Sequence, residues 1–210
     1  FSKSGFDSNT KLTASAVGSN GGAPLAQLTI RNTTLAIDTS KSKILSSLFG
    51  GLLGGNVAID AAGWNGLLNT QVNLLSYLNQ LKIDLTLNAG GYDEVLNSNI
   101  AVGQLIQSTI KLLDPNNTLG ATATIVSLNA LKLAAGKTTV VLGKILNVQS
   151  STPSSALNVN MNLFDLISGY VQLANKTNGL VANFPIDLGL TKITARIQVL
   201  EPPQLSAIGS

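Results

Sequence analysis

Hydrophobic residues recur at helical spacing through the middle of the chain and alternate with polar residues nearer its ends. Helical spacing predicts helices over residues 43–53, 61–81, 92–113, 118–135 and 163–174. Alternation or short apolar runs predict strands over residues 28–30, 35–37, 56–59, 83–87, 138–148, 156–161, 180–188 and 190–200. Because most helices lie between the strands, we predict an α+β fold, with a mostly antiparallel sheet and a central group of amphipathic helices.

Residues that begin and end helices stand beside several of these segments. Gly54 follows the helix over 43–53, and Gly136 follows the one over 118–135, as a C-terminal glycine does. Asp60 and Asn162 precede the helices over 61–81 and 163–174, where a short polar side chain can accept a backbone N–H. These residues predict where the helices end more firmly than hydrophobicity alone.

The first twenty residues differ from the rest of the chain. They are mostly polar, and only Leu12, Ala14 and Ala16 alternate as in a weak strand. We therefore divide the chain into a polar N-terminal arm over 1–20 and a single α+β domain over 21–210. The arm is our candidate assembly element, because an extended segment can add to the sheet edge of a neighbouring molecule.

The chemical inventory is sparse. The chain has no His and no Cys, and its acidic residues are eight scattered Asp and two Glu. This composition excludes imidazole-based acid–base catalysis, a Cys nucleophile and the usual zinc sites. We therefore predict a protein that is not an enzyme, with no catalytic residues, no cofactor and no metal site.

Charge is also scarce. Charged residues make up 11% of the chain, and the net charge is +3. Lys and Arg are spread along the sequence instead of clustered, which argues against nucleic acid as a partner. Asn is about as common as Gly, of which there are 20. Such a neutral polar surface repels other copies weakly, which favours self-association.

The longest uncharged stretch, residues 61–81, does not suit a membrane. It contains six Asn and Gln side chains, which a spanning helix would leave without partners in lipid. We therefore predict no transmembrane segment in this chain. Since the sequence opens on Phe1 without a Met, we expect that a targeting segment has been removed or is absent.

Three groups of segments resemble the exported C-terminal portion of TadG-like proteins, which accompany bacterial Tad/Flp pilus systems. The segments are residues 51–57, 65–68 and 72–75, then 91–96 and 103–105, then 161–166, 172–175 and 196–204 with Gly209. The resemblance implies a bacterial envelope or cell-surface protein with a non-enzymatic part in pilus assembly or anchoring. It carries over no catalytic residues, and this sequence lacks the N-terminal anchor usual in the family.

Two hypotheses about function follow. The first is a non-catalytic structural or assembly protein of the bacterial cell surface, either pilus-associated or the repeating subunit of an extracellular filament, whose partners are itself or pilus proteins. The second is a glycan-binding, adhesin-like surface module that uses Asn side chains and the aromatic residues Trp64, Tyr77 and Tyr92. Trp64 also lies on the apolar stripe of the helix predicted over 61–81, a position that favours packing in the core. Both place the protein outside the cell or on the cell surface.

Overall fold

The structure, a computed structural model, describes residues 37–87, 92–120, 122–146, 148, 154–179, 182–187, 192–201 and 205. The chain divides into two units, Phe1–Ile30 and Arg31–Ser210, and every described residue belongs to the second. The candidate arm residues Leu12, Ala14 and Ala16 lie outside the described residues, as does the strand predicted over 28–30.

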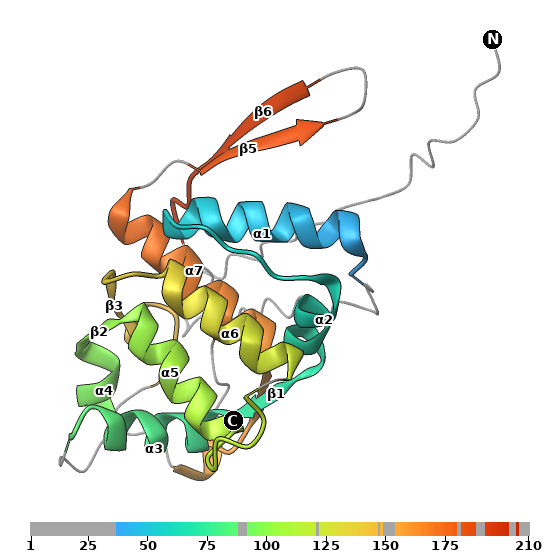
Figure 1. The fold of residues 1–210 in the computed structure, drawn as a ribbon. Helices are drawn as coiled ribbons and strands as arrows, with labels where there is room; N and C mark the ends of the chain where they lie inside the picture. The colour runs from blue at the N-terminus through green and yellow to red at the C-terminus, as the bar shows by residue number, and fades with distance from the viewer. Residues whose placement is uncertain are drawn as a thin grey trace. The chain divides into compact units, whose positions relative to one another are not determined.

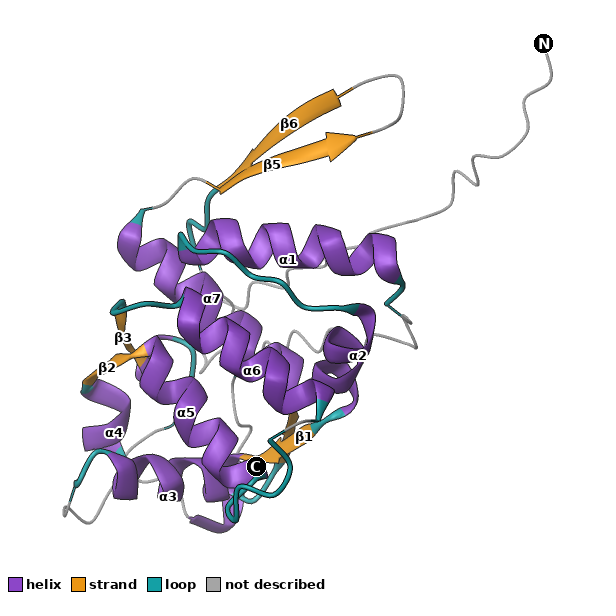
Figure 2. Ribbon diagram, viewed as in Figure 1, coloured by secondary structure: helices purple, strands orange, loops and turns teal. Residues whose placement is uncertain are grey.

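The described residues form seven α-helices and short antiparallel strand pairs, which confirms the predicted α+β fold (Figure 1). The helices are α1 (Thr39–Leu53), α2 (Ala61–Asn69), α3 (Leu74–Asp84), α4 (Asp93–Asn97), α5 (Val102–Leu113), α6 (Ala123–Ala134) and α7 (Leu163–Asn178). Figure 2 shows how far helices outweigh strands.

The strands form three two-stranded antiparallel sheets. They are β1 (Gln71–Asn73) with β4 (Asn160–Asn162), β2 (Asn99–Ala101) with β3 (Thr139–Val141), and β5 (Ala182–Asp187) with β6 (Lys192–Ile197). The β5–β6 hairpin confirms the two strands predicted near the C-terminus. The other four strands are only three residues long, so the sheet content is smaller than predicted.

Three of the short strands, β1, β2 and β4, run directly into an α-helix, and the first helical N–H extends the strand pairing. Leu74 N donates to Val159 O, Val102 N to Thr138 O, and Leu163 N to Thr70 O, each at 2.9 Å. The opening N–H groups of a helix have no acceptor within that helix. Here, one such group on each of α3, α5 and α7 instead bonds to the segment opposite. Each short strand therefore fixes the position and direction of the helix that follows it.

The same arrangement corrects two helix predictions. The helix predicted over 61–81 is two helices, α2 and α3, separated by β1. Asn73 ends β1 and caps α3, since its side chain accepts from Ser76 N at 3.0 Å. The helix predicted over 92–113 is likewise α4 and α5, separated by β2. In both cases backbone pairing with a distant segment interrupts an apolar pattern that would suit a continuous helix.

Several strand predictions are also wrong. Residues 83–87 contain the end of α3 and a turn, and residues 56–59 are extended without a strand partner. The strand predicted over 138–148 is confined to β3 and gives way to the 3₁₀ helix Leu142–Lys144. The one over 156–161 yields only β4, after the 3₁₀ helix Ser154–Leu157. The helix expected from residue 118 begins at Ala123, where the Thr122 side chain accepts from Ile125 N.

The predicted helix caps agree with the structure. The Asp60 side chain accepts from Gly63 N at 2.7 Å and begins α2. Asn162 accepts from Phe164 N at 2.8 Å and begins α7. Gly54 ends α1 with φ of 72°, and Gly136 follows α6 with φ of 56°, both in the left-handed region that glycine adopts without strain.

Helix α7 is the centre of the core. It packs against α1, α2 and α5, and its first residue follows β4. An aromatic cluster joins it to the first two helices: the rings of Phe49, Trp64 and Phe164 have centroids 4.8 to 6.1 Å apart. Helices α2 and α6 approach so closely that a Cβ on Gly63 or Gly66 would collide with Ser127 or Thr124.

One buried hydroxyl, that of Ser46, organises the connection between α1 and α2. Ser46 Oγ donates to Ile59 O at 3.0 Å and accepts from Ile59 N at 3.1 Å and from Trp64 Nε1 at 3.2 Å. Both backbone polar groups of Ile59 are therefore bonded to a side chain. This bonding explains why residues 56–59 are extended without belonging to a sheet.

We expect Ser46→Ala to lower the free energy of unfolding by about 2–4 kcal/mol, because it leaves three buried polar groups without their partner. The matched control is the exposed neighbour Ser47, whose change to Ala should stay within about 0.5 kcal/mol of wild type. Urea unfolding followed by Trp64 fluorescence measures both. Equal values for the two variants would contradict the role assigned to Ser46.

Candidate functional site

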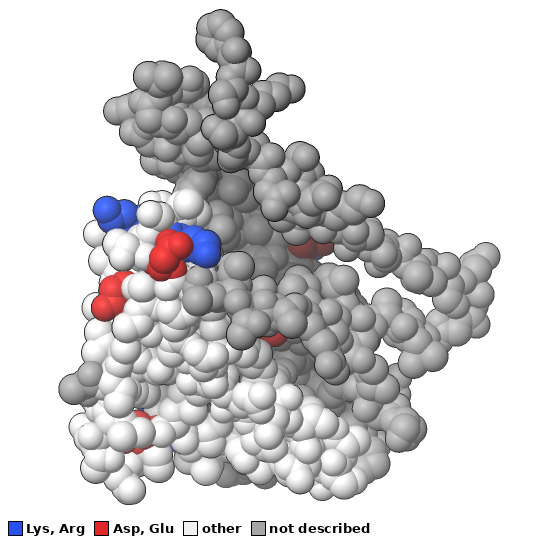
Figure 3. Space-filling view, turned by 90° about the vertical axis from the view of Figure 1, so that its right-hand side faces the viewer, with Lys and Arg blue, Asp and Glu red and all other residues white. Residues whose placement is uncertain are grey.

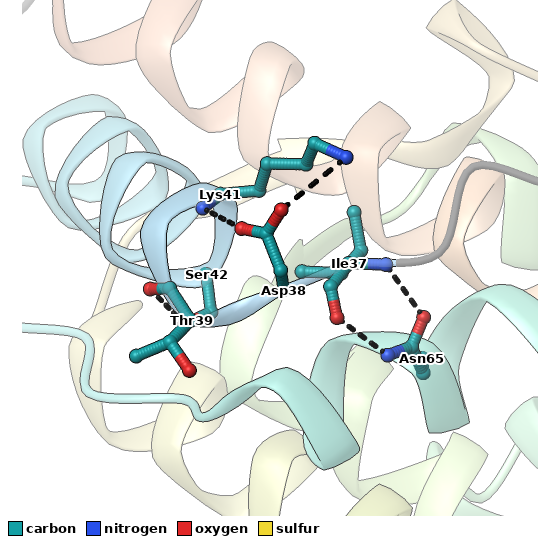
Figure 4. A network of polar contacts seen from close by, with 6 residues as sticks. All are labelled: Ile37, Asp38, Thr39, Lys41, Ser42 and Asn65. Carbon is teal, nitrogen blue, oxygen red and sulfur yellow. Dashed lines mark hydrogen bonds and ion pairs between the residues drawn. The ribbon is translucent and has the colours of Figure 1, made fainter.

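The described domain begins at a firmly held residue, Ile37, which is the point where the N-terminal segment joins it (Figure 4). Asn65 of α2 accepts from Ile37 N at 2.9 Å and donates to Ile37 O at 2.8 Å, as a paired strand would. Asp38 caps α1 by accepting from Lys41 N at 2.9 Å, and this bond lowers the pKa of Asp38. The residues before Ile37 are therefore attached to the domain at a position that two hydrogen bonds hold in place.

Helix α6 exposes two large hydrophobic side chains to solvent. Leu133 is 80% exposed and Val126 is 53% exposed, and they lie two turns apart on one face with Ala123 and Ala130. We call these four residues the α6 stripe. Lys132 is the single charged residue of this helix, and its ammonium group binds Gln107 at 2.7 Å. The stripe is therefore an apolar surface almost without charge.

The low charge predicted from composition is visible on the surface. Figure 3 shows one face on which Lys and Arg side chains lie near the top and a few Asp and Glu side chains are scattered, while most of the described surface on this face is uncharged. Two ion pairs occur among the described residues, Asp38 with Lys41 and Asp84 with Lys111. Repulsion between copies of this surface is correspondingly weak.

An open groove lies at the C-terminal end of α3. Its lining residues are Asn79, Lys82, Ile83, Thr86 and Leu87. Beside it, the half-buried Tyr92 donates its hydroxyl to Asn79 Oδ1 at 2.9 Å, and Lys82 Nζ lies 5.5 Å from the Tyr92 ring centroid. An amide, an ammonium group and an aromatic ring therefore meet at one place on the surface.

The other two aromatic residues considered for glycan binding do not reach this groove. Trp64 and Tyr77 are fully buried, so they cannot stack on a ligand. Trp64 packs in the aromatic cluster, and Tyr77 lies 6.3 Å from Tyr170 between centroids, where burial raises the pKa of both hydroxyls. Neither residue can therefore serve the glycan hypothesis, since both lie on the apolar faces of α2 and α3, and for Trp64 this agrees with the core packing that the sequence pattern favours.

Asp84 follows the groove residue Ile83 in the sequence and links α3 to α5. Its carboxylate accepts from Ser108 Oγ at 2.6 Å, from Lys111 Nζ at 2.6 Å and from Gln80 Nε2 at 3.1 Å. Burial raises the pKa of Asp84, but the hydrogen bonds from Lys111, Ser108 and Gln80 outweigh it and hold the pKa below its usual range. The carboxylate links two helices, because Gln80 belongs to α3 while Ser108 and Lys111 belong to α5.

No group of three or more His, Cys, Asp or Glu residues within the described ranges could hold a metal ion. Among the same residues, none of the helices combines the length and the apolar character needed to cross a membrane.

Comparison with known proteins identifies a family. Residues 41–172 match a family described as a domain of unknown function, DUF8293. The chain belongs to this family. No curated protein and no solved structure matches the chain. The matched region runs from α1 into α7 and contains the three strand–helix junctions, while the arm and the β5–β6 hairpin lie outside the match.

We expect Asp84→Asn to lower the free energy of unfolding at about pH 7 by about 1–2 kcal/mol, because an amide cannot pair with Lys111. A lowered pKa in the folded state means that the stabilisation is present above the usual Asp pKa and is lost as the pH falls through the lowered value. The difference from wild type should therefore shrink towards about pH 2. Urea unfolding across this range measures it, with the exposed Glu94→Gln as control.

Proposed function

We propose that this protein is a non-catalytic structural or assembly protein of the bacterial cell surface. It acts through contacts with copies of itself or with pilus proteins, as a pilus-associated component or the repeating unit of an extracellular filament. The observation that carries the proposal is the chemistry of the chain. It has no His, no Cys and few charges. Many polar side chains of the described residues cap helices or join one helix to another.

Three further features support this proposal. The α6 stripe offers an apolar contact surface with almost no charge to oppose a second copy. The segment that carries the N-terminal arm joins the described domain at Ile37, which Asn65 holds in place, and this attachment suits a segment that engages a neighbour. The resemblance to TadG-like proteins covers most of the chain from about Leu25 onward and points to the same class of activity.

Removal of residues 1–17 should abolish ordered assembly, because the arm supplies a contact between copies. Analytical ultracentrifugation and electron microscopy of the full chain and the shortened chain measure this, with thermal unfolding as the control for an intact fold. We expect the full chain to form regular oligomers or filaments and the shortened chain to remain monomeric. A full chain that stays monomeric at high concentration would remove the self-assembly hypothesis.

A second candidate function rests on the groove beside Tyr92. Asn79 and Lys82 provide a hydrogen-bonding amide and a cation next to an aromatic ring, a combination that suits a glycan. The ligand would be neutral or acidic, because Lys82 is the charged residue in the lining.

We expect Tyr92→Ala to abolish binding to any hit on a glycan array if this second function is right. Tyr92→Phe, which keeps the ring and loses the bond to Asn79, should weaken it less. Trp64 is unsuitable as a test residue because it is buried in the core. An array without hits for the wild-type chain would eliminate the glycan hypothesis and leave the assembly hypothesis untouched.

A further inference from the structure

The β5–β6 hairpin is a sheet of two strands, and among the described residues no third strand pairs with it. Two-stranded hairpins are marginally stable in water unless a further strand or a packed layer supports them. Each strand also exposes one row of backbone N–H and C=O groups along its outer edge. The hairpin therefore has two edges at which a strand could add, and they are not equivalent.

Pro185 reveals which backbone groups face outward. It lies opposite Thr194 in the register of the hairpin. Directly opposed residues alternate between pairs that exchange hydrogen bonds and pairs whose N–H and C=O point away from each other. A proline has no N–H, so it fits the second kind of pair without loss to the ladder. By this parity, the outward N–H groups of β6 belong to Lys192, Thr194 and Arg196.

By the same parity, the outer edge of β5 lacks one backbone N–H donor. Its outward positions are Asn183, Pro185 and Asp187, so the middle donor is missing. Helix α1 also lies beside β5, with β6 on the far side of the hairpin (Figure 1). The β6 edge therefore has a full row of donors and is the one open to an added strand.

We propose that the β6 edge accepts the arm segment Leu12–Ala16 of a second copy as a third strand. This inference rests on the proposed assembly function and names its contact. The arm segment has the period-two pattern of β6, in which Ile193, Ala195 and Ile197 alternate with polar residues. Apolar and polar positions of the two strands can thus lie on matching faces.

Charge favours the arm over other candidate strands. Residues 12–17 carry no charge, whereas β6 carries Lys192 and Arg196. A pair of β6 strands from two copies would bring these cations together, and like charges on opposed strands are destabilising. The neutral arm adds to β6 without that penalty.

The arm also has the length to reach another molecule. Nineteen residues lie between Val17 and Ile37, so an extended chain joining the two spans up to about 70 Å. Because Asn65 fixes Ile37, this reach is measured from a defined point on the donor domain.

A synthetic peptide of residues 8–18 tests the contact directly. Its binding to the chain lacking residues 1–17 is measured by fluorescence anisotropy. Strand addition uses the N–H groups of every second residue, so N-methylation at one parity, either Leu12, Ala14 and Ala16 or Thr13 and Ser15, should weaken binding at least about tenfold. Methylation at the other parity should leave it nearly unchanged. Equal effects at both parities, or no binding at all, would overturn the proposal.

The acceptor edge is tested by Thr194→Pro, which removes an outward N–H and leaves the ladder to β5 complete. We expect peptide binding to fall at least about tenfold, while Thr194→Val, which keeps the N–H, binds as the wild type does. If Thr194→Pro unfolds the chain, Arg196→Pro tests the next outward position. Wild-type binding by a folded proline variant at either position would overturn the assignment to β6.

These outcomes separate the contact from the function. If deletion of residues 1–17 abolishes assembly but the proline variants assemble normally, the assembly function stands and β6 is not the acceptor. If the full chain never assembles, the assembly function fails, whatever the peptide binds. Mixing two differently tagged full chains distinguishes exchange of arms between copies from docking of each arm on its own hairpin, which would overturn the proposal.

Discussion

The hydrogen bond from the first residue of a helix to the residue just before the strand opposite is the constraint on which this fold depends. Leu74, Val102 and Leu163 each open a helix with such a bond, and each is buried. In an isolated helix these N–H groups need water or a side chain as acceptor. Here they continue a three-residue ladder, so the pairing of β1 with β4 sets where both α3 and α7 begin. Very short strands can thereby place long helices.

The second determinant is the use of amides inside the domain. Asn175 is fully buried in α7, where its side chain donates to Leu52 O at 3.1 Å and accepts from Val199 N at 2.8 Å. Asn162 caps α7 and also donates to Leu68 O. Composition suggests that the abundant Asn residues build a neutral surface. The structure adds that several act as internal links between segments far apart in the sequence, which an uncharged side chain does at lower desolvation cost than an ion.

The sequence predicts the fold class, the helix caps and the two C-terminal strands, but it misses the strand–helix junctions. A cap such as Asp60 or Asn162 acts within a few residues, so its signal is local and readable. The β1 strand is a single apolar residue, Val72, between two polar ones, and its identity as a strand depends on Met161 almost ninety residues away. Within an apolar pattern that already suits a helix, three residues of alternation are too few to stand out. The same difficulty hides β2, which is centred on Ile100.

The proposed contact between the arm and β6 likewise depends partly on local sequence pattern and partly on pairing between distant residues. The alternation of Leu12, Ala14 and Ala16 is readable in the sequence, whereas the difference between the two hairpin edges requires the register that places Pro185 opposite Thr194. A chain with so few charges has little general repulsion to prevent wrong association, so its specificity must come from local features. Pro185 removes one N–H donor from the β5 edge, and the two cations of β6 disfavour pairing between the β6 edges of two copies. A neutral segment is then the occupant that meets the fewest obstacles, and residues 12–16 are uncharged and have an alternating sequence pattern.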